Sequence, residues 1–342
     1  MKSLLTLIFL STMSAYASPS PSGYERGNGG FQILCQPQSS LGKGVYSLDR
    51  IEGEKLYQLK PDPRLHFYED ENEIVLNVLQ KLEQINPTRA QLFRRWFYEL
   101  LSHREFVEGL YIQPVNDGNV VILPLGCELR QAAVFIANSD QTQIRFIFDK
   151  SLWDDSSPLD RAFLLIHELL FRESRLPENN HLNSMASRYL NSWLFSNIET
   201  MNQDQWLGKL TEANFKNADY NGVPIILTYK KRFGDFANTP ILRFPNSRGI
   251  RKAILAPTFT IKISSNEVFS RSCPNPIPKL GFTDWVEFYP TGRIKQLVFS
   301  EPSTYAPDCI LYNRNNSLEF DELGNLKKAS FINVKLFFDF KE

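Results

Sequence analysis

Apolar side chains recur at helical spacing in two neighbouring segments of the first half of the chain. Residues 72–85 place their apolar positions on one face, and Asn86 followed by Pro87 is typical of the start of a second helix. The same period continues through Phe93 and Trp96. The pattern predicts two consecutive helices that each bury one apolar stripe.

Two further helices are expected before residue 200. Residues 157–160 (Ser-Pro-Leu-Asp) combine a capping serine, a proline at the first helical position and an acid at the third, which predicts a helix that ends at about residue 175. An apolar stripe over about 183–197 predicts the next helix. Short β-forming runs predict strands at 31–34 and 144–148.

The pattern changes after about residue 215, where glycine, proline, asparagine and alternating β-formers replace helical spacing. Phe244, Phe288 and Phe320 are each followed, at equal offsets, by an aliphatic residue, a basic residue and two further apolar positions. Each unit predicts a strand, a turn and a second strand. The units loosely resemble hairpin repeats of the MORN type, but the tyrosine and paired-glycine spacing of that family is absent, so its lipid-binding and partner-binding roles are not implied.

These patterns predict an α+β protein. A mixed α/β domain is expected over residues 31–200, a connecting helix or linker over 201–214, and a domain of antiparallel β-hairpins arranged as a meander over 215–342.

The N-terminus has the features of a secretory signal peptide. Lys2 precedes an apolar run over residues 4–10, and Ala15 and Ala17 are small residues at the positions that a signal peptidase requires. A membrane anchor is the alternative, but spanning hydrocarbon needs about 20 apolar residues. We therefore expect cleavage after Ala17, a flexible leader over residues 18–30, and a periplasmic or extracellular mature protein with no transmembrane segment.

Charge excludes one class of partner. The 342 residues carry 38 Lys and Arg against 38 Asp and Glu. A protein that binds nucleic acid through phosphate contacts usually has a basic excess. We therefore expect no nucleic-acid partner.

Export makes disulfides the expected state of the four cysteines, which are Cys35, Cys127, Cys273 and Cys309. Their spacing allows three pairings. If the two-domain division holds, one bridge in each domain is the economical choice, which pairs Cys35 with Cys127 and Cys273 with Cys309. A cysteine metal site is disfavoured because no C-x-x-C pair occurs.

One polar cluster is a candidate for chemistry. His167 and Glu168 lie in the middle of the helix that follows Ser157, and His181 follows shortly after it. A zinc protease would need a second histidine one turn after His167, where the chain has Phe171. No metal site and no cofactor is therefore predicted. The candidates for catalysis are His167, Glu168 and His181, and the candidates for binding are Arg172, Glu173, Ser184 and Arg188.

A non-catalytic role of this cluster is the competing interpretation. Arg161, Glu168, Arg172 and Arg175 lie at helical spacing, which predicts a solvated row of ion pairs on one face. His167 lies among apolar residues, where a histidine is more often a hydrogen-bonded core residue.

The order of several segments resembles a group of uncharacterised exported proteins from predatory bacteria. The resemblance covers roughly residues 29–195 and includes the Gly29-Gly30 pair before a cysteine-containing strand, the segment 123–127 (Leu-Pro-Leu-Gly-Cys) and the segment 151–154 (Ser-Leu-Trp-Asp). Its most specific part is the His-Glu helix with Phe171-Arg172-Glu173. The resemblance implies a shared fold and no known activity.

Together these observations favour an exported, disulfide-stabilised binding or interaction module whose partner is a protein or another component of the cell envelope. The alternative is a hydrolase that uses His167, Glu168 and His181, with or without a metal. A purely structural envelope component is a third possibility.

Overall fold

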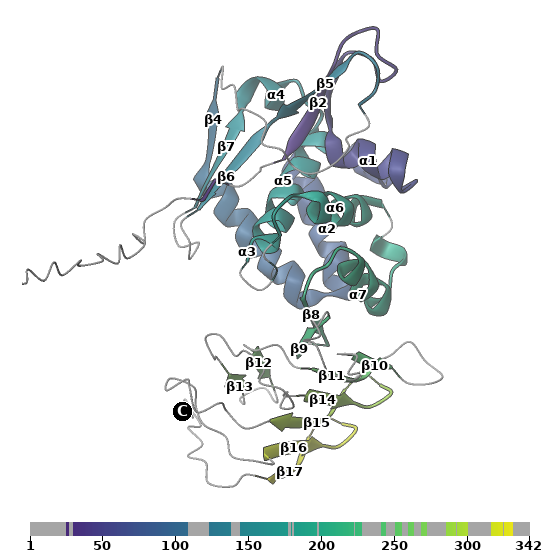
Figure 1. Ribbon diagram of the computed structural model, residues 1–342, viewed down its shortest axis with the longest axis vertical. Coiled ribbons are helices and arrows are strands. Elements are labelled where there is room, and N and C mark those ends of the chain that lie inside the picture. Colours follow the sequence, from purple (N-terminus) through teal and green to yellow (C-terminus); the bar gives the residue numbers. More distant parts are fainter. Residues whose placement is uncertain are drawn as a thin grey trace, which may run out of the picture.

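Helices and small sheets form the first part of the protein, and a stack of antiparallel strands forms the second (Figure 1). This α+β organisation is the one that the sequence predicts. The predicted signal peptide, most of the predicted leader, Cys273 and Cys309 lie outside the described residues. The computed structural model describes residues 25–26, 30–108, 123–137, 144–176, 179, 181–196, 198–221, 223–227, 241–243, 250–254, 259–262, 268–271, 285–291, 293–299, 316–323 and 325–330.

The predicted helices are present, and two of them begin at the predicted caps. The side chain of Asn86 accepts a hydrogen bond from the Arg89 amide, and the side chain of Ser157 accepts one from the Asp160 amide. Each satisfies an amide that the first helical turn leaves without a partner. The helices are α1 (Leu48–Leu56), α2 (Glu71–Ile85), α3 (Pro87–His103), α4 (Lys150–Asp154), α5 (Pro158–Ser174), α6 (Met185–Ser196) and α7 (Gln203–Glu212), with 3-10 turns η1 (Pro63–Phe67) and η2 (Ile198–Thr200).

Helix α5 lies at the centre of the helical part, among α1, α2, α3 and α6 (Figure 1). All of its residues from Ala162 to Ser174 are buried. None of the helices among the described residues is long and apolar enough to cross a membrane.

The central position of α5 corrects the predicted row of ion pairs. Glu168 is completely buried, and the arginines instead bind groups of other segments. Arg161 donates to the carbonyl oxygen of Trp153, and Arg175 donates to that of His181. Arg172 forms an ion pair with Glu99 at 2.6 Å. The row is not solvated because neighbouring elements cover the whole circumference of the helix.

Two small sheets accompany the helices. In the first, β2 (Phe31–Cys35) pairs antiparallel with β3 (Gly44–Ser47) on one side and β5 (Cys127–Gln131) on the other. The second has the order β1 (Glu25–Arg26), β6 (Ala133–Ala137), β7 (Ile144–Asp149) and β4 (Arg104–Val107), in which β4 and β7 are parallel.

The C-terminal strands form the predicted meander. Three hairpins, β10–β11, β14–β15 and β16–β17, lie side by side in one antiparallel sheet of six strands (Figure 1). Each corresponds to one unit of the sequence repeat. The strands of this part are β8 (Asn217–Tyr220), β9 (Val223–Ile226), β10 (Ile241–Arg243), β11 (Ile250–Ile254), β12 (Phe259–Lys262), β13 (Val268–Arg271), β14 (Trp285–Phe288), β15 (Ile294–Phe299), β16 (Asn316–Phe320) and β17 (Leu326–Ser330).

One cluster of buried apolar side chains runs from the helices into this sheet. It includes Trp206 of α7, Phe215, Tyr220 of β8 and Phe288 of β14. The rings of Tyr220 and Phe288 meet edge to face with centroids 5.1 Å apart. The predicted domain boundaries at residues 200 and 215 stay a prediction, since apolar packing continues across them.

Candidate functional site

The candidate site is centred on His167, in the middle of α5. Its Nδ1 lies 2.8 Å from Oδ2 of Asp49, which α1 contributes. The side chains of His167 and Asp49 are only 1% and 2% exposed. A carboxylate at Nδ1 fixes the orientation and the tautomer of an imidazole, in the core as well as in an active site.

Glu168 follows on the same helix and is completely buried. Its Oε1 accepts a hydrogen bond of 2.6 Å from the backbone amide of Gly30, at the point where the chain enters β2. Among the described residues, its Oε2 has no hydrogen-bond partner. Burial raises the pKa of Glu168 to about 7, and Asp49 adds to the rise, whereas His167 and the Gly30 hydrogen bond oppose it.

Helix α6 completes the arrangement. Asn191 donates from Nδ2 to Oδ2 of Asp49 (2.6 Å) and to the carbonyl oxygen of Phe163 (2.8 Å). Arg188 lies one turn earlier, with its Nε 3.3 Å from Oε2 of Glu52 on α1. We call this set the buried polar cluster, and its members are Asp49, Glu52, His167, Glu168, Arg188 and Asn191.

The structure brings some of the predicted site residues together and separates others. His167, Glu168 and Arg188 belong to the buried polar cluster. His181 does not: its amide donates to the carbonyl oxygen of Ser174, and its Nε2 lies 3.0 Å from the Asn214 carbonyl oxygen. Ser174 is seven residues after His167, which is about 10 Å along a helix. Burial lowers the pKa of His181.

The predicted binding residues face different partners. Glu173 forms an ion pair with Arg89 of α3 at 2.6 Å, and Arg172 lies over the Trp96 ring with its guanidinium carbon 4.5 Å from the ring centroid. Ser184 is buried, and its carbonyl oxygen accepts from the Arg188 amide at the start of α6. Each of these residues contacts a different segment, and a role in binding stays a prediction.

Sequence reasoning missed Asp49, Glu52 and Asn191. The available signal was the three-residue spacing of Asp49 and Glu52, which puts both acids on one face of a short helix. That face would be expected to be solvated. Its burial depends on packing against α5 and α6, more than 100 residues later in the chain.

The buried polar cluster contains groups that are typical of a general base, but these groups lack the exposed surface through which a substrate would reach them. Asp49 orients the His167 imidazole, and the Glu168 carboxyl group, with a pKa of about 7, is able to exchange its proton near neutral pH. However, the side chains of Asp49, His167 and Glu168 have at most 2% of their surface exposed. Among the residues that the structure describes, no group of three or more His, Cys, Asp or Glu is arranged to hold a metal ion.

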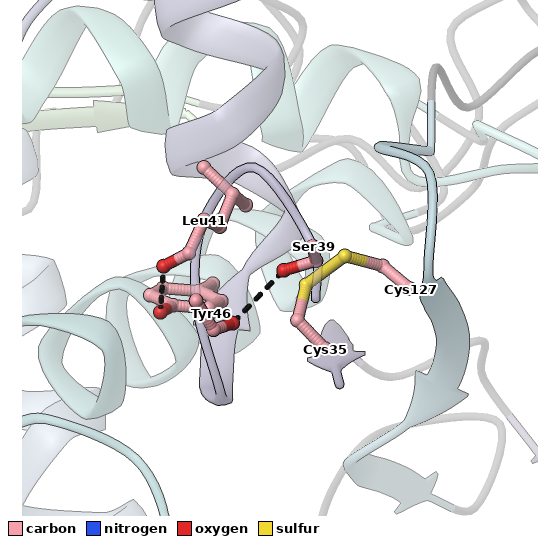
Figure 2. Close-up of a disulfide and its surroundings, with 6 residues drawn as sticks. Cys35, Ser39, Leu41, Tyr46 and Cys127 are labelled. Carbon is pink, nitrogen blue, oxygen red and sulfur yellow. Dashed lines mark hydrogen bonds between the residues drawn. A yellow bond between two sulfur atoms is a disulfide. The ribbon is translucent and has the colours of Figure 1, made fainter. Parts of the chain in front are cut away.

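The predicted disulfide between Cys35 and Cys127 is present. The two residues are directly opposite each other on β2 and β5, with their Cα atoms 4.1 Å apart (Figure 2). Gly126, at φ +78°, completes the turn that leads into Cys127, and this conformation favours glycine. Two hydrogen bonds hold the turn between β2 and β3 beside the bridge (Figure 2). The Ser39 hydroxyl donates to the Gly42 carbonyl oxygen, and the Tyr46 hydroxyl donates to the Leu41 carbonyl oxygen. The predicted pairing of Cys273 with Cys309 stays a prediction.

A comparison of the chain with protein-family models, with curated proteins and with solved structures finds no match.

Proposed function

We propose that the protein is exported and acts as a binding module of the cell envelope or the extracellular space. In this proposal a disulfide-stabilised scaffold of helices and small sheets supports a hairpin sheet that contacts the partner. The observation that carries the proposal is the contrast between the two parts: the chemically capable side chains of α5 are buried, whereas the hairpin sheet exposes charged side chains on one face.

The Cys35–Cys127 bridge supports export, because disulfides persist mainly in oxidising compartments. The test is a fusion of the full chain to a reporter phosphatase that is active only after export. We expect an active fusion whose mature protein begins at Ser18. Replacing Leu7 and Phe9 by arginine should abolish export, and replacing Ser20 and Ser22 by alanine is the matched control. An active fusion of the arginine variant would contradict the proposal.

Binding is tested by sedimentation of the purified mature protein with insoluble envelope material. Sacculi and outer-membrane vesicles are used separately, over a range of protein concentrations. Saturable co-sedimentation with either material supports the proposal. An absence of binding to both materials and to soluble envelope polysaccharide would contradict it.

A hydrolase is the second candidate, because the Asp49–His167 contact and the raised pKa of Glu168 are typical of general-base sites. The test is turnover of peptide, glycan and ester substrates by the wild type and by the variants His167→Ala and Glu168→Gln. Activity that is lost in both variants while the fold is retained would favour the hydrolase. His181→Ala serves as a control, because His181 faces Asn214 rather than the buried polar cluster.

A further inference from the structure

The three hairpins of the C-terminal sheet share one irregularity. In each of them the pairing shifts by one residue just before the turn, so that the second strand carries one extra residue. This is a β-bulge. The shift occurs at Leu242/Arg243, Glu287/Phe288 and Glu319/Phe320, and the extra residues are Arg251, Lys295 and Lys327.

The bulge turns two consecutive side chains toward the same face of the sheet. In β11, Ile250 and Ala253 are buried, whereas Arg251 is exposed and Lys252 is partly exposed between them. A regular strand would alternate at each residue. The bulged strands of the other two hairpins also have two consecutive residues that are exposed or partly exposed, Lys295 and Gln296 in β15 and Lys327 and Lys328 in β17.

Five of these six outward positions are basic. Glu287 of β14 lies opposite Lys252 and Gln296, and Glu319 of β16 lies opposite Gln296 and Lys328. Lys295 contacts Glu287 at 3.2 Å, and the Lys252 ammonium lies 3.6 Å from the centroid of the Trp285 ring. Five basic groups against two acidic ones make this face positive, although the whole chain is neutral. We call it the basic bulge face.

The positive charges are evenly spaced. The order of the strands is β11, β14, β15, β16 and β17, so the three bulges lie on every second strand. Neighbouring strands are about 4.8 Å apart, so successive bulge residues, Arg251 to Lys295 and Lys295 to Lys327, are roughly 10 Å apart across the sheet. That interval is similar to the length of one disaccharide in an extended glycan.

We infer that the basic bulge face binds a linear acidic polysaccharide with about one anionic group per disaccharide, which lies across the strands. The inference rests on the proposed function and names the chemical class of its partner. The spacing between the basic side chains of successive bulges is the reason for choosing acidic polysaccharides over other anionic partners. A nucleic acid carries a phosphate about every 3.4 Å along each strand, which is far denser than the row of bulges.

The experiment measures the affinity of the full mature protein for hyaluronan oligosaccharides by calorimetry, since hyaluronan has one carboxylate per disaccharide. Uncharged dextran oligomers, single-stranded DNA and vesicles of anionic phospholipid are measured in parallel at about 150 mM salt. We expect binding to hyaluronan that weakens as salt increases, because exposed charges are screened, and no binding to dextran.

The decisive variant is Arg251→Glu with Lys295→Glu and Lys327→Glu. Reversing three exposed charges is expected to weaken binding by at least about tenfold. The matched control reverses three exposed basic residues of the helical part, Lys43, Lys55 and Arg95. The triple glutamine variant at the bulges tests the loss of charge without reversal, and circular dichroism verifies that each variant is folded.

Equal losses in the bulge variant and in the control would overturn the inference, because the attraction would then be non-specific. Tighter binding of DNA or of anionic vesicles than of hyaluronan would also overturn it, and so would the absence of binding to hyaluronan. If the bulge variant still sediments with sacculi or vesicles as the wild type does, the inference fails while the proposed function stands.

Discussion

A carboxyl group without exposed surface that accepts one hydrogen bond binds its proton more tightly than the same group in water. Glu168 is in this position, with a pKa raised to about 7 from the ordinary value of 4.5. The folded protein therefore holds this proton more tightly than the unfolded chain does. The resulting stabilisation is fully present below about pH 4.5 and is lost as the pH rises through about 7.

Glu168→Gln is expected to remove this dependence. The amide oxygen of glutamine retains the hydrogen bond from Gly30, and no charge is buried at any pH. Above about pH 7 the variant should be more stable than the wild type by up to about 3 kcal/mol. Near pH 4.5 the two should be nearly equal.

Urea unfolding at pH 4.5 and pH 8 measures the difference, and Glu69→Gln on the surface is the control. A lower stability of Glu168→Gln at pH 8 would show that the ionised carboxylate stabilises the fold.

Gly30 determines how closely β2 approaches α5. A Cβ atom at this position would lie 2.2 Å from Cδ1 of Leu164 and 3.2 Å from Oε1 of Glu168. Gly30→Ala should therefore destabilise the protein by about 1–3 kcal/mol through overpacking. Gly208→Ala in α7 is the matched control, since a Cβ there meets nothing within 4 Å.

Denaturant unfolding of both variants is the measurement. The Gly208→Ala control should stabilise the protein by roughly 0.5–1 kcal/mol through helix propensity. Equal effects of the two substitutions would contradict the close packing at Gly30.

The contact of α3 with α5 depends on a buried ion pair. Arg89 donates from Nε and Nη2 to Glu173, and its guanidinium also lies near the rings of Trp206 and Phe215. Glu173→Ala leaves that cation buried, so we expect a loss of about 3–5 kcal/mol. The double variant Arg89→Met with Glu173→Leu should recover much of this loss in thermal unfolding. A double variant as unstable as the single one would contradict the interpretation.

Element by element, the sequence predicts what local chemistry determines. Asn86 and Ser157 cap their helices by accepting from amides three positions later. Each of the three hairpins is indicated by a pattern of residues that lies entirely within one repeat unit. It does not predict the surroundings of α5. The partners of His167, Arg172 and Glu173 are Asp49, Glu99 and Arg89, which are 73 to 118 residues away. A helix with a polar row looks the same in the sequence whether water or another helix covers that row.

For the molecule as a whole, the Cys35–Cys127 bridge is a cross-link between distant segments of the helical part. The two cysteines are 92 residues apart, and the loop between them contains α1, α2 and α3. Cross-linking so long a loop reduces the entropy of the unfolded chain, which corresponds to about 4.6 kcal/mol. Replacing both cysteines by serine should lower the free energy of unfolding by about that amount. Chemical denaturation without reductant measures it, and an unchanged midpoint would contradict the expectation.

If the protein is exported as proposed, the position of this bridge also affects how it matures. Cys35 and Cys127 are the first and second cysteines in the chain. When such a chain leaves a translocation channel N-terminus first, Cys35 has no other cysteine of its own chain to react with until Cys127 emerges. An oxidase that joins cysteines in their order of appearance therefore makes the native bond directly, and this bridge needs no isomerase to correct it.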